Sequence, residues 1–101
     1  PFRIMYIHNK MKYEWDPQKS LHNKKAHGCA FDIVEGFNWD QAIEVLDDRF
    51  DYGEERWLAL APIGSKLYAL AFSPRGRDKV RVISLRPATK NERKAYVKAK
   101  S

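Results

Sequence analysis

Four arginines in the second half of the chain have the chemistry to bind phosphate groups. Arg56 begins one run of strand-forming residues, Arg75 follows another, and Arg81 and Arg86 lie within a third, RVISLR. A guanidinium group stays charged and can donate two parallel hydrogen bonds to a pair of phosphate oxygens. An arginine in a strand is costly to bury without such a partner. We therefore expect a polyanion to bind these arginines.

Three other side chains could transfer or donate protons beside a bound phosphate. His27 has an unperturbed pKa near ~6.5 and could act as an acid or a base, or it could bond the end of a helix beside Gly28. Glu55 is a second candidate base, or simply a turn carboxylate. Tyr96 could donate a hydrogen bond to phosphate, or its ring could pack against the domain.

The distribution of charge along the chain is more informative than its net charge of +6. Residues 32–55 contain nine acidic residues and one basic residue, a net charge of −8, whereas residues 75–101 contain ten basic and two acidic residues, a net charge of +8. This polarity predicts two surfaces with different partners, of which the basic one binds a polyanion. In the alternative, both are solvated surfaces with internal ion pairs, as Arg56 would form with Glu54 or Glu55.

The composition excludes several classes of protein. A chain of 101 residues is long enough for a single core, and 44% hydrophobic residues argue against global disorder. No run approaches the ~18 apolar residues of a membrane span. The one cysteine, Cys29, rules out an intrachain disulfide and fits a reducing cytosol. His22, His27 and Cys29 match no common zinc spacing, so no metal site is expected.

The first half of the chain predicts a strand and two helices. KYEW at residues 12–15 reads as a short strand. Asp16 and Pro17 then form a strong helix start, and Gly28 is placed to end that helix in the left-handed conformation. NWDQAIEVLDD at residues 38–48 has the spacing of a second helix. Its cap would be Asn38 or Asp40, and its inward-facing residues would be Ala42, Ile43 and Leu46.

The second half of the chain predicts three strands and a closing helix. Strand-like runs at residues 56–62, 66–73 and 79–86 are joined by short connections that contain glycine, as in hairpins. The last helix would begin with a capping box of Thr89 and Glu92. The predicted fold is α+β, with helices packed on a small antiparallel sheet in the order β-α-α-β-β-β-α.

Neither face of the last predicted strand is purely apolar. Simple alternation places Val80, Val82, Ser84 and Arg86 on one face, and Arg81, Ile83 and Leu85 on the other. This pattern predicts a central strand that is covered by helices on one side and open to a partner on the other.

Three separated motifs carry a resemblance to a known family. They are YEWDPQK…N…HG near the start, GEERW in the middle and PRGRDKVRVISLRPATKNERKAY near the end. Their order and spacing over residues 11–96 resemble those of the BrnT family, the toxins of bacterial type II toxin–antitoxin pairs. The matching positions include Trp15, Asp16, Asn23, His27, Gly28, Arg56, Arg75, Arg81, Ser84, Arg86, Ala88, Glu92, Arg93 and Tyr96.

The resemblance implies a RelE-like ribonuclease in the bacterial cytoplasm that cleaves RNA and halts translation. It implies neutralisation by a BrnA-type antitoxin, whose ribbon-helix-helix domain would bind the promoter DNA of the operon. The ribosome is a further candidate partner, whereas no cofactor, metal or membrane contact is expected. The whole chain, residues 1–101, would form one toxin domain, with residues 1–10 as an added edge strand or a disordered extension.

Metal-free RNA cleavage needs a base for the 2′-hydroxyl proton, cations for the phosphorane charge and an acid for the departing 5′-oxygen. We expect Arg75, Arg81 and Arg86 to share the substrate phosphates, since the strand order does not require Arg56 to lie with Arg86. The expected catalytic residues are Arg75, Arg86, His27, Glu55 and Arg56. The expected RNA-binding residues are Arg81, Lys25, Lys24, Arg93, Tyr96 and Lys90.

The chain departs from the family pattern at two places. Ala26 stands where the family usually has lysine before His-Gly, with Lys25 one place earlier, and VEGFNW lengthens the connection after the first helix. Ala26 favours an alternative function, a non-catalytic toxin-like module that binds RNA or protein. A third hypothesis, a DNA-binding regulator, rests on the basic helix at residues 88–100. It is weakened because no helix-turn-helix pair is recognisable.

Overall fold

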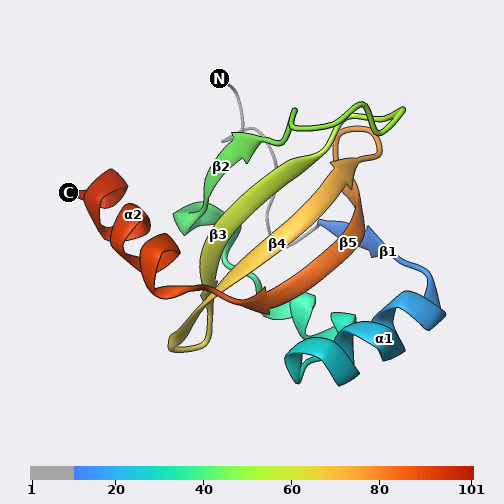
Figure 1. The fold of residues 1–101 in the computed structure, drawn as a ribbon, viewed down its shortest axis with the longest axis horizontal. Helices are drawn as coiled ribbons and strands as arrows, with labels where there is room; N and C mark the ends of the chain where they lie inside the picture. The colour runs from blue at the N-terminus through green and yellow to red at the C-terminus, as the bar shows by residue number, and fades with distance from the viewer. Residues whose placement is uncertain (1–10) are drawn as a thin grey trace.

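A five-stranded mixed sheet forms the centre of the protein, which a computed structural model describes for residues 11–101 (Figure 1). The strand order is β1-β5-β4-β3-β2, in which β1 runs parallel to β5 and all other neighbours are antiparallel. The strands are β1 (Lys12–Glu14), β2 (Ile43–Leu46), β3 (Trp57–Ile63), β4 (Lys66–Pro74) and β5 (Lys79–Pro87). The expected edge strand or extension at residues 1–10 lies outside the described residues.

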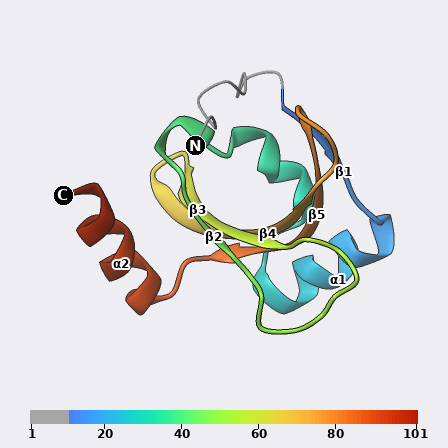
Figure 2. The same ribbon diagram turned by 90° about the horizontal axis from the view of Figure 1, so that it is seen from above.

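Helical segments lie on both sides of the sheet and beyond one of its ends. They are α1 (Pro17–His27), the 3₁₀ helices η3 (Phe31–Gly36) and η4 (Trp39–Gln41), and α2 (Lys90–Lys100). Figure 2 shows η3 inside the curve of the sheet, whereas α1 and the connection between β2 and β3 lie on the opposite side. α2 extends away from the sheet after β5 (Figures 1 and 2).

The predicted helix ends are confirmed. The Asp16 side chain caps α1 by accepting a hydrogen bond from the N–H of Gln18 at 2.9 Å. Gly28 ends α1 with a φ of 82°, a conformation that L side chains rarely adopt. Thr89 and Glu92 form the expected capping box at the start of α2. These ends are set by local backbone chemistry, which explains why the sequence alone predicts them.

The three strands predicted in the second half are confirmed to within one residue at each end. The prediction of a purely antiparallel sheet is wrong, because β1 pairs in parallel with the first part of β5, with Tyr13 opposite Val80. A parallel neighbour requires a connection across the fold rather than a hairpin. The sequence of β1 carries no signal for that pairing.

The second helix predicted at residues 38–48 is wrong. η4 covers three residues, and β2 then pairs with β3 so that Ile43 lies opposite Leu60. Ala42 packs against the core on one face of the sheet and Ile43 against a smaller cluster on the other, as successive strand residues do. A β-branched residue such as Ile43 fits this half-buried surface, and the edge of β3 supplies its partner. Tertiary pairing therefore overrides the helical spacing.

One face of the sheet is closed by the main core, whereas the opposite face is only partly covered. η3 and η4 pack on the first face. The largest fully buried side chains there are Phe31, Val34, Leu70, Phe72, Val82 and Leu85. The opposite face carries a smaller cluster of Leu60, Ala69 and Ala88, with Tyr96 of α2 partly buried against it. The open part of this second face is available for polar and charged side chains.

A β-bulge in β5 changes the direction of its side chains. The register with β4 shifts between Ala71 and Phe72, which leaves Ile83 as an extra residue of β5. A bulge of one residue reverses the alternation beyond it. Val82 and Leu85 therefore both face the main core, where each is almost completely buried.

The bulge also brings two arginines to one face. Simple alternation predicts that Arg81 and Leu85 share a face and that Arg86 lies on the other, and this prediction is wrong. Because Leu85 faces the main core, its neighbour Arg86 points to the opposite side, as Arg81 does. Both arginines thus belong to the partly covered face.

Asn23 joins α1 to the edge of β5. Its side chain is buried, and its Nδ2 donates hydrogen bonds to the carbonyl oxygens of Leu85 at 2.6 Å and Cys29 at 2.8 Å. Its Oδ1 accepts a hydrogen bond from the N–H of Leu85 at 3.3 Å. The carboxamide thus pairs with both backbone groups of one residue, as a neighbouring strand would. α1 is held against the part of β5 that lies beyond the end of β1.

Candidate active site

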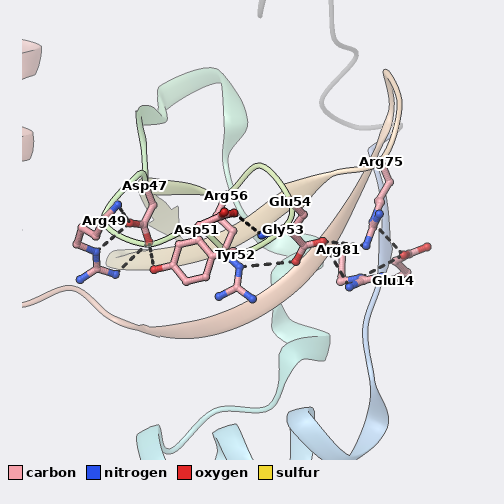
Figure 3. Close-up of polar contacts among 10 residues, drawn as sticks. All are labelled: Glu14, Asp47, Arg49, Asp51, Tyr52, Gly53, Glu54, Arg56, Arg75 and Arg81. Atoms are coloured by element: carbon pink, nitrogen blue, oxygen red, sulfur yellow. Dashed lines mark hydrogen bonds and ion pairs between the residues drawn. The ribbon is translucent and has the colours of Figure 1, made fainter.

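Three arginines from different strands meet at one end of the sheet. Arg56 precedes β3, Arg75 follows β4, and Arg81 lies near the start of β5. Because β4 is antiparallel to both β3 and β5, its end lies beside the beginnings of both. Figure 3 shows the three side chains gathered around Glu54. Sheet topology therefore joins arginines that are separated in the sequence.

Two glutamates tie these arginines into one network. Glu54 Oε1 lies 3.1 Å from Arg75 Nη2 and 3.6 Å from Arg81 Nη1, and Glu54 Oε2 lies 3.6 Å from Arg56 Nε. Glu14 of β1 lies 3.7 Å from Nε of both Arg75 and Arg81. Lys79 Nζ lies 3.5 Å from Glu14 Oε1. We refer to Glu14, Glu54, Arg56, Arg75, Lys79 and Arg81 as the arginine cluster.

The arginine cluster has more cationic donors than carboxylate acceptors. Four cations and two carboxylates give it a net charge of +2. Among residues 11–101, only the contact between Arg75 Nη2 and Glu54 Oε1 is a hydrogen bond within the cluster. The Nε–H groups of Arg56 and Arg75 are shielded from solvent and have no hydrogen-bond acceptor in that part of the chain. The guanidinium groups of Arg75 and Arg81 are themselves partly exposed, so an anion with several oxygens, such as phosphate, could accept hydrogen bonds that the two carboxylates leave unused.

A surface pocket of about 370 Å³ adjoins the arginine cluster. Arg81, whose side chain is 45% exposed, lies on one side of it, and the exposed Lys19 of α1 is also part of its wall. The complete lining is Glu14, Trp15, Asp16, Lys19, Arg81 and Val82. The pocket thus extends from the start of β5 to the first turn of α1, and its lining carries two cations and two carboxylates.

Arg86 lies at the other end of β5, where its charge is paired. Its Nη1 and Nη2 donate hydrogen bonds to Glu92 Oε1 and Oε2 at 2.7 and 2.9 Å. This contact lowers the pKa of the Glu92 carboxyl to about 2 and raises the pKa of Arg86. Glu92 Oε1 also accepts a hydrogen bond from the N–H of Thr89 at 2.9 Å. The expectation that Arg86 lies together with Arg75 and Arg81 is therefore wrong, because Arg86 is at the other end of β5 and pairs with Glu92.

The other predicted residues of the first half lie outside the arginine cluster. Lys24, Lys25 and His27 are exposed on the second half of α1. The eleven residues of α1 rise about 15 Å along the helix axis, and the pocket adjoins its first turn, so His27 lies at the far end. Glu55 is exposed beside Arg56 in the sequence and makes no hydrogen bond or ion pair within residues 11–101.

The predicted residues of α2 form a separate basic surface. The Arg93 guanidinium donates a hydrogen bond to the carbonyl oxygen of Ala88 at 3.0 Å, and Tyr96 Oη donates to that of Gln41 at 2.6 Å. Burial raises the pKa of Tyr96, whose ring packs on the smaller apolar cluster. A shallow pocket of about 390 Å³ on this helix is lined by Lys90, Arg93, Lys94, Val97 and Lys98. Tyr96 thus attaches α2 to the domain, the packing role considered from the sequence.

The site residues predicted from the sequence lack three members of the arginine cluster, Glu14, Glu54 and Lys79, and Glu54 enters that prediction only as an ion-pair partner of Arg56. The predicted pairing of Arg56 with Glu54 is confirmed. Glu14 lies between Tyr13 and Trp15, which pack against the main core, so the alternation of the strand places its carboxylate on the opposite face. The alternation can be read from the sequence. It places Glu14 beside the arginines only because β1 pairs in parallel with β5.

Residues 11–101 contain neither a metal-ligand cluster nor a membrane-spanning helix. No group of three His, Cys, Asp or Glu side chains there could hold a metal ion. In the same residues, no helix has the length and apolar character needed to cross a bilayer. Cys29 is buried, and burial raises the pKa of its thiol. A buried thiol with a raised pKa is poorly reactive and fits a structural role.

Comparison with known proteins places these features in a family. Residues 15–92 match the family described as "Ribonuclease toxin, BrnT, of type II toxin-antitoxin system". The fold is similar to the 1.1 Å crystal structure of the Brucella abortus ribonuclease toxin BrnT, with a TM-score of 0.59 and 29% sequence identity. That similarity covers 79% of this chain and 99% of the Brucella chain. No curated protein sequence matches the chain. The chain belongs to the BrnT family of ribonuclease toxins of type II toxin–antitoxin systems.

Proposed function

We propose that the protein cleaves RNA at the arginine cluster, without a metal ion, by attack of the substrate's own 2′-hydroxyl on the adjacent phosphate. The observation that carries the proposal is the convergence of Arg56, Arg75 and Arg81 on one partly exposed surface with a net positive charge. Loosely paired surface cations contribute little to stability, but they bind polyanions strongly. Their arrangement is therefore better explained by a phosphate ligand than by the needs of the fold.

In this mechanism, the substrate phosphate competes with the glutamates for the guanidinium groups. Arg75 and Arg81 donate hydrogen bonds to the phosphate oxygens and stabilise the charge of the phosphorane. Glu54 then accepts fewer hydrogen bonds from the arginines, and its carboxylate takes the proton of the 2′-hydroxyl. The O2′–P bond forms and the P–O5′ bond breaks, and the departing 5′-oxygen takes a proton from water, since guanidinium groups do not release theirs at neutral pH.

We further propose a BrnA-type ribbon-helix-helix antitoxin as the partner and the bacterial cytoplasm as the place of action. A type II toxin acts in the presence of its antitoxin, so the partner must block the basic surface or the approach to it. The antitoxin would cover the arginine cluster or hold α2, and it alone would bind the promoter DNA. RNA cleavage by the free toxin would then inhibit translation.

The test is cleavage of RNA in the presence of a chelator, with and without ribosomes. The expected products carry 2′,3′-cyclic phosphate and 5′-hydroxyl ends. Glu54→Gln is expected to lower the rate about 10²- to 10⁴-fold, the usual contribution of a general base. Glu55→Gln is the matched control, because it removes the neighbouring carboxylate, which has no partner within residues 11–101.

Two results would contradict the proposal. Intact RNA after incubation with folded wild-type protein in both arms would favour the non-catalytic module. Ala26 and the contacts of Arg56, Arg75, Arg81 and Arg86 with carboxylates also favour that module. Loss of activity in Glu55→Gln with full activity in Glu54→Gln would move the base to the exposed neighbour.

A further inference from the structure

The connection between β2 and β3 is a loop, residues 47–56, whose two ends are joined by a hydrogen bond. The N–H of Asp47 donates a hydrogen bond to the carbonyl oxygen of Arg56 at 2.8 Å, which continues the pairing of the two strands. Within the loop, the N–H of Gly53 donates to Asp51 Oδ1 at 3.1 Å, and Gly53 has a φ of 73°. A backbone hydrogen bond thus joins the ends of the loop, and the Asp51 side chain fixes its turn.

Two aromatic rings stand in this loop. Phe50 is 67% exposed, and its ring meets the edge of the Tyr52 ring with centroids 5.7 Å apart. The Arg56 guanidinium carbon lies 4.0 Å from the centroid of Tyr52, and that of Arg49 lies 5.9 Å from the centroid of Phe50. Each ring of this pair therefore lies against one guanidinium group. Aromatic rings and arginines are also the side chains on which unpaired nucleic acid bases stack.

Asp47 holds the ring of Tyr52 in place. Its carboxylate accepts two hydrogen bonds from the Arg49 side chain, at 2.9 and 3.0 Å, and one from Tyr52 Oη at 3.3 Å (Figure 3). The hydrogen bonds from Arg49 lower the pKa of Asp47 to about 2, so this carboxylate is ionised at neutral pH. An exposed ring held in this way loses little conformational entropy on binding.

The aromatic pair is continuous with the arginine cluster. Arg56 stacks on Tyr52 and also lies 3.6 Å from Glu54, which in turn contacts Arg75 and Arg81. Figure 3 shows this row of side chains, from Asp47 and Tyr52 through Arg56 and Glu54 to Arg81 and Arg75. An RNA strand whose phosphates bind the arginine cluster would therefore place a neighbouring base at the loop of residues 47–56.

We propose that Phe50 and Tyr52 form a stacking platform for an unpaired base of the RNA substrate, next to the phosphate-binding arginine cluster. The inference rests on the proposed function and adds the substrate class, which is single-stranded RNA. Duplex RNA has its bases stacked on each other, so no base is free to reach an aromatic ring. Stacking accepts every base, so the platform adds affinity and position without reading sequence.

The experiment compares two ligands of equal charge. One is a short single-stranded 2′-O-methyl RNA, which cannot be cleaved through its 2′-oxygen, and the other is the same ribose–phosphate chain without bases. Wild-type protein is expected to bind the first more tightly. Phe50→Ala is expected to weaken binding of the RNA roughly 5- to 100-fold and to leave binding of the abasic chain unchanged.

Two further variants complete the test. Leu21→Ala removes a comparably exposed apolar side chain on α1 and should change neither affinity. Phe50→Trp should retain the preference for bases, because it keeps a stacking ring.

Three results would contradict the platform. Equal affinity of wild-type protein for both ligands would overturn the platform while leaving the phosphate site intact. Binding of neither ligand would overturn the proposed RNA site as well. A Phe50→Ala protein that binds RNA with wild-type affinity but no longer binds the antitoxin would show that the ring contacts the antitoxin instead.

Discussion

The two ends of β5 each present an arginine on the same face of the sheet, but the surroundings of Arg81 and Arg86 differ. Arg86 forms two short hydrogen bonds with one carboxylate, Glu92, which the backbone of α2 also holds. Arg81 shares two carboxylates with other cations at distances of 3.6 and 3.7 Å. The charge of Arg86 is therefore neutralised by one carboxylate, whereas Arg81 belongs to a cluster in which cations outnumber carboxylates.

This difference separates an arginine with a structural partner from one that we propose to bind the substrate. A planar guanidinium that meets a carboxylate in two parallel hydrogen bonds gains orientation as well as energy. Arg86 therefore links the last strand to the helix that follows it. Several cations around two glutamates leave donors unsatisfied, and an incoming phosphate can use them. Residue type alone does not distinguish the two roles.

The largest expected effect is on catalysis at the arginine cluster. Arg75→Ala should lower kcat/KM for RNA cleavage about 10²- to 10³-fold, because it removes a donor to the phosphorane. Arg86→Ala should stay within about 5-fold of wild-type protein, since its effect is on the attachment of α2. Arg77→Ala is the matched control, because it removes an exposed arginine of the same hairpin.

Equal losses in Arg75→Ala and Arg86→Ala, with both proteins folded, would break the distinction between the two ends of β5. A loss in Arg77→Ala as large as that in Arg75→Ala would show that net charge, rather than the geometry of the cluster, controls the rate.

The next effect is on stability and follows from the pair of Arg86 and Glu92. At pH 7, Arg86→Met should lower the free energy of unfolding by about 1–3 kcal/mol, the usual value of a charged hydrogen bond. The folded pKa of Glu92 is lowered from 4.5 to about 2, so its contribution is fully present above pH 4.5 and is lost as the pH falls toward 2. Denaturant unfolding of both proteins between pH 7 and pH 2 measures this difference.

The difference between wild-type protein and Arg86→Met should shrink steadily below pH 4.5. Comparing two proteins cancels the titration of Asp47, whose folded pKa is also about 2. A difference that stays constant to pH 2 would mean that packing of the arginine chain, rather than the ion pair, stabilises α2.

The smallest expected effect, on stability and on RNA affinity, is that of replacing Lys79, which lies at the margin of the arginine cluster. Its 3.5 Å contact with Glu14 is exposed, so Lys79→Ala should change the free energy of unfolding by less than about 1 kcal/mol. If Lys79 contacts one phosphate, the slope of log affinity against log salt for single-stranded RNA should fall by about 0.7. An unchanged slope would place Lys79 outside the RNA site.

Local signals in the sequence predicted the helix ends and the hairpin strands, because caps and turns depend on neighbouring residues. Asp16 with Pro17, and Thr89 with Glu92, specify their helix ends without help from the rest of the chain. The sequence predicts a helix where β2 lies, because the pairing partner of β2, β3, is separated from it by a long connection.

The arrangement of the candidate site depends on features that no local pattern carries. The bulge at Ile83 puts Arg81 and Arg86 on one face, contrary to simple alternation. The place of Arg56 in the cluster follows from the strand order, and that of Glu14 follows from a parallel pairing. The sequence identifies the arginines as a group, but only the folded sheet divides them into separate sites.

The side chain of Asn23 has a consequence for self-association. A strand with free backbone groups at its border invites another polypeptide to add itself to the sheet, and this route leads to aggregates and fibrils. β1 shields only the first part of β5, and the amide of Asn23 occupies both polar groups of Leu85 farther along. A single helical residue thus blocks the register that an invading chain would need, while the face with the arginines stays open to solvent.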